Sequence, residues 1–188
     1  MWNQNLLNDN RVLYGLPIFV YGSPVLRKVS EDIPQDYPNL KSFLEDMWET
    51  MYKSDGVGLA APQVGRNIRL FVIDGSGMSD DDPTMVDFRK AFINPRIIQS
   101  DGTPWVFNEG CLSLPNIRED ISRNAKIIIE YYDENFNFFR EEYDGLKARI
   151  IQHEYDHLEG ILLVDHISAI KRKLLAGKLN AIRKVRWM

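Results

Sequence analysis

The sequence is poor in the features that mark secreted and membrane proteins. Its 188 residues include a single cysteine, Cys111, so no disulfide can form within the chain, which is typical of a reducing compartment. No segment approaches the ~20 consecutive apolar residues that a membrane-spanning helix needs. The first fifteen residues contain no basic start followed by an apolar run, so they do not indicate a secretory signal. We therefore expect a cytoplasmic protein with no membrane contact.

Acidic residues are missing from one end of the chain. Residues 166–188 contain seven Lys or Arg and no Asp or Glu, whereas residues 1–165 hold 16 basic and 27 acidic side chains. Such a basic segment is usually the solvated face of a helix. It would also be the part of the protein that meets an anionic partner.

The apolar pattern predicts one α+β domain over residues 1–188, in which residues 1–14 form a flexible extension, natural or introduced. The strands are expected to be mostly antiparallel and to surround a central helix, with an early amphipathic helix and a C-terminal helix. Helices are predicted over residues 38–54, 145–160 and 167–187, strands over 66–75, 91–100, 124–134 and 136–145, and a surface loop over 75–84.

Two of the three histidines lie in the segment QHEYDH, residues 152–157. His153 and His157 are four residues apart, so on a helix both imidazoles face one point and can bind the same metal ion. Glu154 would lie beside that point and could accept a proton from water. This HExxH pattern therefore indicates a metal centre on the predicted central helix.

The same segment also allows an interpretation without a metal. The two histidines could be ordinary helix residues that hydrogen-bond to Asp156 and Glu159. The third histidine, His166, lies outside the motif, and we assign it no role.

A catalytic metal site usually has three protein ligands and an open position for water. The longer protease motif HExxHxxGxxH is absent, because Leu163 stands where the third histidine would be. The remaining candidate is Cys111, in the polar segment NEGCLSLP. A lone cysteine more often packs in the core than binds a metal. Here a two-histidine site needs a third ligand, which favours Cys111 as that ligand.

Three segments together resemble the signature motifs of peptide deformylases, in the same order and at similar spacing. They are GVGLAAPQ at 56–63, EGCLS at 109–113 and QHEYDH at 152–157. The resemblance covers the chain from about Ile18 to the C-terminal helix. It implies a metal-dependent hydrolase that removes the formyl group from the N-terminal N-formylmethionine of newly made polypeptides and releases formate.

The resemblance also implies roles for individual residues. The metal would be bound by Cys111, His153 and His157, with Glu154 as the catalytic acid and base. Such a reaction needs donors to the substrate carbonyl as it gains charge. The resemblance assigns this task to the Gln63 side chain and the backbone N–H of Leu112.

Residues that bind the peptide are expected around the first and third motifs. Gly56 and Gly58 either end the preceding helix or let the substrate backbone approach closely, and one glycine can serve each purpose. Ile150 and Ile151, with Leu112, are candidates for the methionine pocket. Helix geometry cannot turn both isoleucines toward one pocket, so at least one is expected in the core.

Two further features surround these motifs. Glu109 is expected to stabilise the residues that bind the metal, by pairing with an arginine such as Arg118. The alternative is that Glu109 is a solvated surface residue. The acidic segment GSGMSDDDPTMVDFRK, residues 75–90, lengthens the connection between two strands, and we expect it to leave the motifs untouched.

The implied metal is Fe(2+) in the cell, although a Cys and two His also suit Zn(2+), Ni(2+) or Co(2+) in a purified sample. The implied partners are the N-formylmethionyl peptides of nascent chains and, through the basic C-terminal helix, a weak contact with ribosomal RNA. No contact with DNA is expected. The alternatives are a HExxH endoprotease and a non-catalytic protein that a metal ion stabilises.

Overall fold

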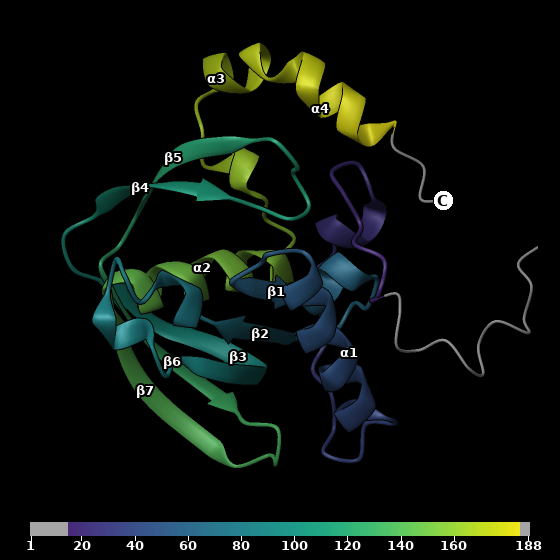
Figure 1. Ribbon diagram of the computed structural model, residues 1–188, viewed down its shortest axis with the longest axis vertical. Coiled ribbons are helices and arrows are strands. Elements are labelled where there is room, and N and C mark those ends of the chain that lie inside the picture. The colour runs from purple at the N-terminus through teal and green to yellow at the C-terminus, as the bar shows by residue number, and fades with distance from the viewer. Residues whose placement is uncertain (1–14, 185–188) are drawn as a thin grey trace, which may run out of the picture.

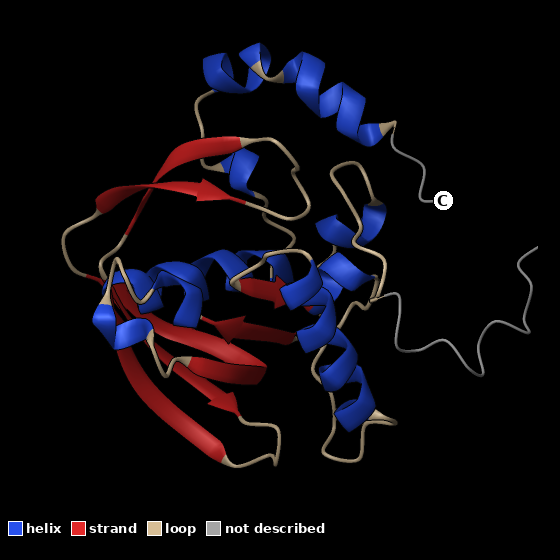
Figure 2. Cartoon of the chain, viewed as in Figure 1, coloured by secondary structure: helices blue, strands red, loops and turns tan. Residues whose placement is uncertain are grey.

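The computed structural model describes residues 15–184. The predicted extension at residues 1–14 lies outside the described residues. Two antiparallel sheets form the framework (Figures 1 and 2): a larger one with the strand order β1-β2-β3-β6-β7 and a hairpin of β4 and β5. The strands are β1 Gly58–Ala60, β2 Leu70–Asp74, β3 Arg89–Asp101, β4 Trp105–Gly110, β5 Arg118–Arg123, β6 Lys126–Tyr132 and β7 Phe138–Asp144.

Four α-helices accompany these strands within residues 15–184: α1 Leu40–Lys53, α2 Gly145–Leu158, α3 Ala169–Leu174 and α4 Ala176–Arg183. In Figure 1, α2 lies between the larger sheet and the β4–β5 hairpin, while α3 and α4 lie beyond the hairpin. None of the helices in this part of the chain combines the length and apolar character needed to cross a membrane.

The larger sheet is covered on both faces at β2, whereas its edge strand β7 has one exposed face. Alternate residues of a strand point to opposite faces. Phe71 and Ile73 of β2 pack in one cluster with α2, whereas Leu70 and Val72 pack in another cluster with α1. A strand covered on both faces reads as a continuous apolar run, as LFVID does.

The prediction of a mixed fold with antiparallel strands is confirmed, with differences in detail. Three short strands, β1, β4 and β5, were not predicted, because neither a strong alternation nor an apolar run marks them. The expected C-terminal helix is two helices that meet at Leu175, and Gly177, a weak helix former, stands just beyond the break.

Two of the segment boundaries also differ from the prediction. The loop expected over 75–84 contains two 3-10 turns, η4 Ser76–Met78 and η5 Pro83–Met85. The helix α2 ends at Leu158, and Gly160 follows in the left-handed region with φ 70°. Its N-cap, Asp144, makes no side-chain capping hydrogen bond.

Candidate metal centre

The two histidines of α2 converge with the cysteine that follows β4. The Cys111 Sγ lies 3.3 Å from Nε2 of His157, and one ligand atom from each of Cys111, His153 and His157 lies within 4.8 Å of the other two. Donor atoms 2.0–2.3 Å from a tetrahedral ion are roughly 3.5 Å apart. The three side chains therefore fit a metal of the zinc or iron type in spacing and in chemistry.

The charge on the sulfur also suits metal binding. Burial raises the pKa of the Cys111 thiol, but the charges and hydrogen bonds of His157 and His153 outweigh burial, and the pKa falls to about 5. The thiolate is the form that binds metals. The loop that carries it is held by backbone hydrogen bonds from Leu114 N to Cys111 O, 2.9 Å, and from Tyr21 N to Ser113 O, 2.9 Å.

Glu109 lies directly behind the two-histidine site. Its Oε2 is 2.9 Å from Nδ1 of His153, which leaves Nε2 of that ring for a metal. Arg123 donates to both carboxylate oxygens at 2.8 and 3.0 Å, and Arg149 donates to Oε1 at 2.9 Å. Burial raises the pKa of Glu109, but His153 and Arg123 outweigh it and hold the pKa well below its ordinary value. The imidazole is thus oriented by a carboxylate, as is common in metal sites.

The expected pairing of Glu109 with Arg118 is wrong. Arg118 donates instead to Asn108, at 2.9 Å to Oδ1 and 2.6 Å to the backbone oxygen. Glu109 is buried on the inner face of the hairpin, whereas Arg118 is exposed at the start of β5. The two arginines that do pair, Arg123 and Arg149, were missed.

A local signal existed for only one of these arginines. In β5, burial falls on Ile121 and Arg123, two residues apart, so an alternation count would have placed Arg123 on the inner face. Arg149 lies one turn before His153 on α2, and its Nη2 donates to Trp105 O at 2.6 Å. Nothing near it in the sequence indicates that contact.

The carboxylates suggested as partners of the histidines bind other groups. Asp156 Oδ2 accepts from Arg123 at 2.7 Å and lies 2.7 Å from Nε2 of His166. Glu159 pairs with Arg69 at 2.7 Å. His157 Nδ1 has no hydrogen-bond partner within residues 15–184. These contacts remove the basis for a helix whose histidines are satisfied by neighbouring acids.

Glu154 is buried beside the ligand atoms. Burial raises its pKa to about 7, although the charges of His153 and His157 act to lower it. Its Oε2 has no hydrogen-bond partner in the described part of the chain. A Cβ built on Gly58 would collide with this carboxylate, with Cδ only 2.8 Å away, so Gly58 makes room for Glu154.

Gln63 reaches Cys111 from the first motif, whereas Leu112 follows Cys111 directly in the chain. The Gln63 Oε1 accepts from Ala60 N at 2.8 Å, which turns its Nε2 toward Ser113 Oγ, 3.2 Å, and Cys111 Sγ, 3.7 Å. The backbone N–H of Leu112 donates to no group among residues 15–184. Two N–H donors are therefore available near the sulfur.

The cavity in front of these groups has a volume of about 660 Å³. It brings together most of the residues predicted for the site: Gly56, Gly58, Gln63, Cys111, Leu112, Ile150, His153 and Glu154. His157 is held behind them, 1% exposed. Ile151 does not line the cavity, because the next position on the helix turns into the core, where Ile151 is fully buried.

Two further features shape this cavity. The segment 75–90 contributes Met78 and Asp81 to its lining. The helix α1 is closed by Asp55 in the left-handed region, φ 53°, with hydrogen bonds from Asp55 N to Tyr52 O and from Gly56 N to Met51 O. Gly56 is thus not the left-handed residue. It is small because a Cβ would lie 2.9 Å from Leu112 Cδ1.

Comparisons with known proteins agree over most of the chain. Residues 16–173 match the family model described as polypeptide deformylase. Proteins named peptide deformylase from Flavobacterium psychrophilum and Christiangramia forsetii are 53% and 51% identical over 174 and 176 residues. These matches cover 89% and 90% of this chain, and 90% of each relative.

Solved structures agree with the sequence comparisons. The crystal structure of peptide deformylase from Thermotoga maritima matches with a TM-score of 0.74 and 42% identity, covering 82% of this chain and 99% of that one. A peptide deformylase from Synechococcus elongatus in complex with actinonin matches with a TM-score of 0.77 and 37% identity, covering 92% and 91% of the two chains.

Proposed function

Because the chain belongs to the peptide deformylase family, we propose that the cluster around Cys111, His153 and His157 is its catalytic centre. The protein is an enzyme, a metal-dependent hydrolase that removes the formyl group from the N-terminal methionine of newly made polypeptides. The observation that carries the assignment is the convergence of a thiolate and two imidazoles beside a buried carboxylate without a partner.

Cys111, His153 and His157 would hold the metal, which we propose is Fe(2+) in the cell, with Zn(2+), Ni(2+) or Co(2+) able to replace it in a purified sample. When bound, the ion supplies Lewis acidity and lowers the pKa of water toward ~7. Glu109, fixed by Arg123 and Arg149, keeps the His153 ring in its orientation.

Glu154 is proposed as the proton carrier. A carboxylate whose pKa is about 7 can accept a proton from water and give it to the departing amine near neutral pH. The Gln63 Nε2 and the Leu112 N–H would donate to the formyl oxygen as it gains negative charge. The glycines of 56–58 would let an extended peptide lie along the edge of β1, and Ile150 would contact the methionine side chain.

The remaining proposals concern the whole chain. We propose that α2, which carries the motif, is the central helix of a single catalytic domain. We also propose a cytoplasmic enzyme, because formylated chains are made there. These proposals are supported by the family match over residues 16–173.

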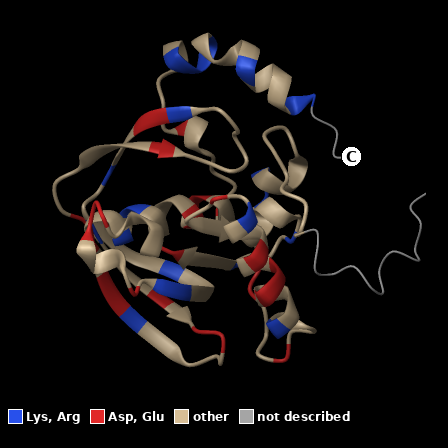
Figure 3. Cartoon of the chain, in the orientation of Figure 1, with Lys and Arg blue, Asp and Glu red and all other residues tan. Residues whose placement is uncertain are grey.

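The basic C-terminal helices are proposed to contact ribosomal RNA weakly. Figure 3 displays Lys and Arg along α3 and α4, with no acidic residue on either helix. Lys173 and Lys178 form no ion pair within residues 15–184, whereas Lys171 pairs with Glu119. Charge reversal in the double variant Lys173→Glu with Lys178→Glu should reduce the amount of protein that sediments with ribosomes at low salt. Unchanged sedimentation would remove the proposal.

The central test is formate release from formyl-Met-Ala-Ser by protein purified without oxygen, together with metal analysis. We expect Glu154→Gln to retain the metal and to lose about 10²- to 10⁴-fold in kcat, because the proton carrier is gone. Glu45→Gln, on the exposed face of α1, is the matched control and should keep full activity.

Other outcomes would favour the alternatives. Cleavage of internal bonds in casein would indicate an endoprotease. Full metal occupancy with no turnover, and no effect of Glu154→Gln on any activity, would indicate a metal-stabilised binding protein.

A further inference from the structure

Arg123 is shared between two carboxylates from different elements. Its Nε and Nη2 donate to the two oxygens of Glu109 at 2.8 and 3.0 Å, and its Nη1 donates to Asp156 Oδ2 at 2.7 Å. The arginine side chain is only 5% exposed, so these two carboxylates, and not solvent, balance its charge. Asp156 on α2 therefore determines in part how strongly Arg123 draws on Glu109.

The third histidine, His166, contacts the same aspartate. Its Nε2 lies 2.7 Å from Asp156 Oδ2. Because Asp156 forms an ion pair with Arg123, its carboxylate has only acceptors to offer. The Nε2 of His166 must therefore carry the proton, and this N–H donates to Asp156 and fixes the direction in which the carboxylate points.

These contacts form one continuous chain from a surface side chain to a proposed metal ligand. The chain runs from His166 through Asp156, Arg123 and Glu109 to Nδ1 of His153. His166, 29% exposed, lines a second cavity of about 540 Å³ together with Arg123 and Asp156. This cavity shares no lining residue with the catalytic one, so the far end of the chain lies outside the catalytic site.

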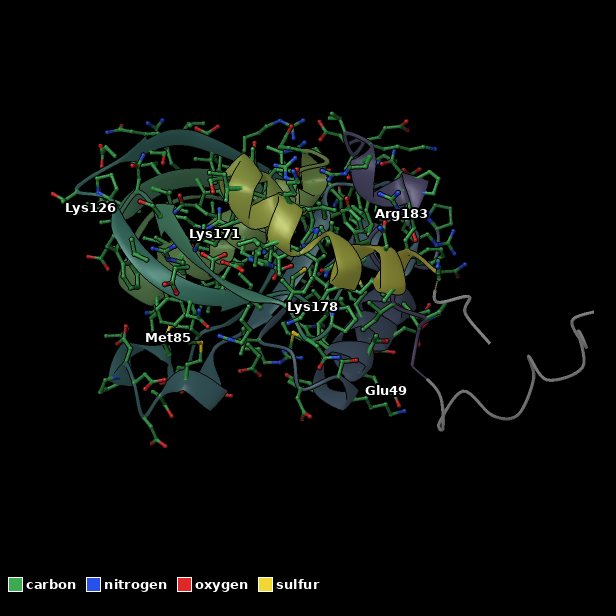
Figure 4. The ribbon with its side chains drawn as sticks, turned by 90° about the horizontal axis from the view of Figure 1, so that it is seen from above. Glu49, Met85, Lys126, Lys171, Lys178 and Arg183 are labelled. Atoms are coloured by element: carbon green, nitrogen blue, oxygen red, sulfur yellow. The ribbon has the colours of Figure 1, made fainter. Side chains whose placement is uncertain are left out.

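The segment that carries His166 is held in place on both sides. The residue follows η6 Leu163–Asp165, and its backbone N donates to Leu163 O at 3.2 Å. Beyond it, Lys171 of α3 pairs with Glu119 of β5 at 3.1 Å. Figure 4 shows α3, with Lys171, lying over the β4–β5 hairpin. The imidazole is therefore presented to Asp156 by a fixed turn.

Building on the proposed function, we propose that Asp156 and His166 are positioning residues of the metal centre. They act through Arg123 and Glu109, and the group that they affect is His153. An imidazole is a better metal ligand when its other N–H meets a strong carboxylate acceptor. Asp156 takes part of the Arg123 charge and so leaves Glu109 the stronger acceptor. Without Asp156, Arg123 draws on Glu109 more strongly, and the imidazole binds an ion less tightly.

The test measures the affinity of the metal-free protein for Co(2+) and Zn(2+) by competition with a chelator. We expect Asp156→Asn to weaken the affinity about tenfold, the lower end of the effect of groups that support a ligand. His166→Phe removes the N–H and should cost about two- to threefold, as for neighbours in one hydrogen-bond network. His166→Gln, which can donate from its own Nε2, should restore most of the affinity. The double variant Asp156→Asn with His166→Phe should bind no more weakly than Asp156→Asn, because His166 acts only through Asp156.

A control variant separates positioning from a general loss of stability. Glu159 caps the end of α2 and pairs with another buried arginine, Arg69, at 2.7 Å, but it has no contact with the chain that ends at His153. Glu159→Gln should lower the free energy of unfolding and leave the metal affinity unchanged. The visible absorption bands of the Co(2+) form should move to longer wavelength in Asp156→Asn and stay in place in Glu159→Gln, because only the former weakens a ligand.

The outcomes separate this proposal from the proposed function. Equal metal affinities for Asp156→Asn and the unmodified protein, or an equal loss in Glu159→Gln, overturn the positioning role while formyl-Met-Ala-Ser is still processed. If Asp156→Asn does not fold, an affinity that His166→Phe leaves unchanged overturns the role instead. An unmodified protein that binds neither ion and releases no formate overturns the proposed function and the positioning role with it.

Discussion

Glu109 is the residue on which the orientation of His153 depends. Its side chain is 5% exposed and lies between the Nδ1 of His153 and two guanidinium groups, those of Arg123 and Arg149. A buried carboxylate is stable only when it is paired and hydrogen-bonded. The same contacts that stabilise Glu109 therefore also hold the imidazole in place.

Replacement of Glu109 should loosen the metal site. We expect Glu109→Gln to weaken metal affinity by about 10- to 100-fold, because a neutral amide orients the ring less well and leaves Arg149 without its charge partner, although Arg123 keeps Asp156. Competition with a chelator measures the change. Glu119→Gln is the control, since Glu119 lies opposite Glu109 across the hairpin and pairs with exposed Lys171. Equal metal affinities for the two variants would contradict a role for Glu109 in holding His153.

At the scale of elements, the end of α2 determines where the chain goes after the site. Gly160, with φ 70°, closes the helix through hydrogen bonds from Ile161 N to Asp156 O, 2.9 Å, and from Gly160 N to His157 O, 3.4 Å. A Cβ at position 160 would lie 2.8 Å from the backbone oxygen of Arg27. The position therefore requires glycine both for its conformation and for the close contact.

The prediction for this helix end is a loss of stability on Gly160→Ala. We expect the free energy of unfolding, measured in urea, to fall by about 1–3 kcal/mol. The left-handed conformation and the contact with Arg27 both become unfavourable when a Cβ is present. Gly177→Ala is the control: this glycine lies in α4 with open space around it, and its replacement should stabilise the protein by about 0.5–1 kcal/mol. Stabilisation by both variants would contradict the expected strain.

The segment after α2 is tied to the N-terminal part by Asp165. Its carboxylate pairs with Arg27 at 2.5 Å and accepts from Leu162 N at 2.8 Å. Burial raises the pKa of Asp165, but the hydrogen bond with Arg27 and the Leu162 N–H outweigh burial and lower it. A carboxylate with a lowered pKa stabilises the fold above its unfolded-state pKa, and this contribution is lost as the pH falls through its folded-state pKa.

Asp165→Asn should therefore reduce stability at neutral pH and have less effect in acid. We expect a loss of about 1 kcal/mol at pH ~7, the size of a partly exposed ion pair with one backbone hydrogen bond. The difference from the unmodified protein should begin to shrink as the pH falls below ~4, the ordinary pKa of Asp in the unfolded chain, and should vanish only as the pH passes the lower folded-state pKa. Thermal unfolding across a pH series measures it, and a constant difference at all pH values would contradict the assignment.

At the scale of the whole molecule, three apolar clusters form the core. One lies between the larger sheet and α2, one between that sheet and α1, and one joins the loop after β4 to η6 Leu163–Asp165 and α4. Of the proposed metal ligands, Cys111 packs against the third cluster. The fold therefore does not depend on the metal for most of its buried apolar surface.

Removal of the metal should abolish activity while leaving the fold in place. We expect unchanged far-UV circular dichroism and a lower Tm in the metal-free protein, because an ion present at 100 times its Kd stabilises the native state by about 2.7 kcal/mol. Fe(2+) or Zn(2+) added back should restore the Tm. Unfolding of the metal-free protein at room temperature would show that the three apolar clusters do not keep the protein folded without the metal.

The sequence by itself determined which chemical groups come together when they are only a few residues apart in the chain. His153 and His157 face one point because residues four apart share a helix face, and the single cysteine supplied the third donor. The resemblance of three motifs to a known family, and not local geometry, proposed Gln63 and Leu112 as carbonyl donors. The prediction for the histidines and Glu154 needed no knowledge of the fold, because it depends on helix geometry and residue chemistry.

Only the tertiary structure decided which distant residues meet. It pairs Glu109 with Arg123 and Arg149 in place of Arg118, turns Ile150 toward the cavity and Ile151 into the core, and brings Asp81 to the wall of the cavity. The physical reason is that these contacts depend on how helices and strands pack, since burial selects among many charged partners of similar chemistry. The packing of α2 between a sheet and a hairpin has no counterpart in any short stretch of sequence.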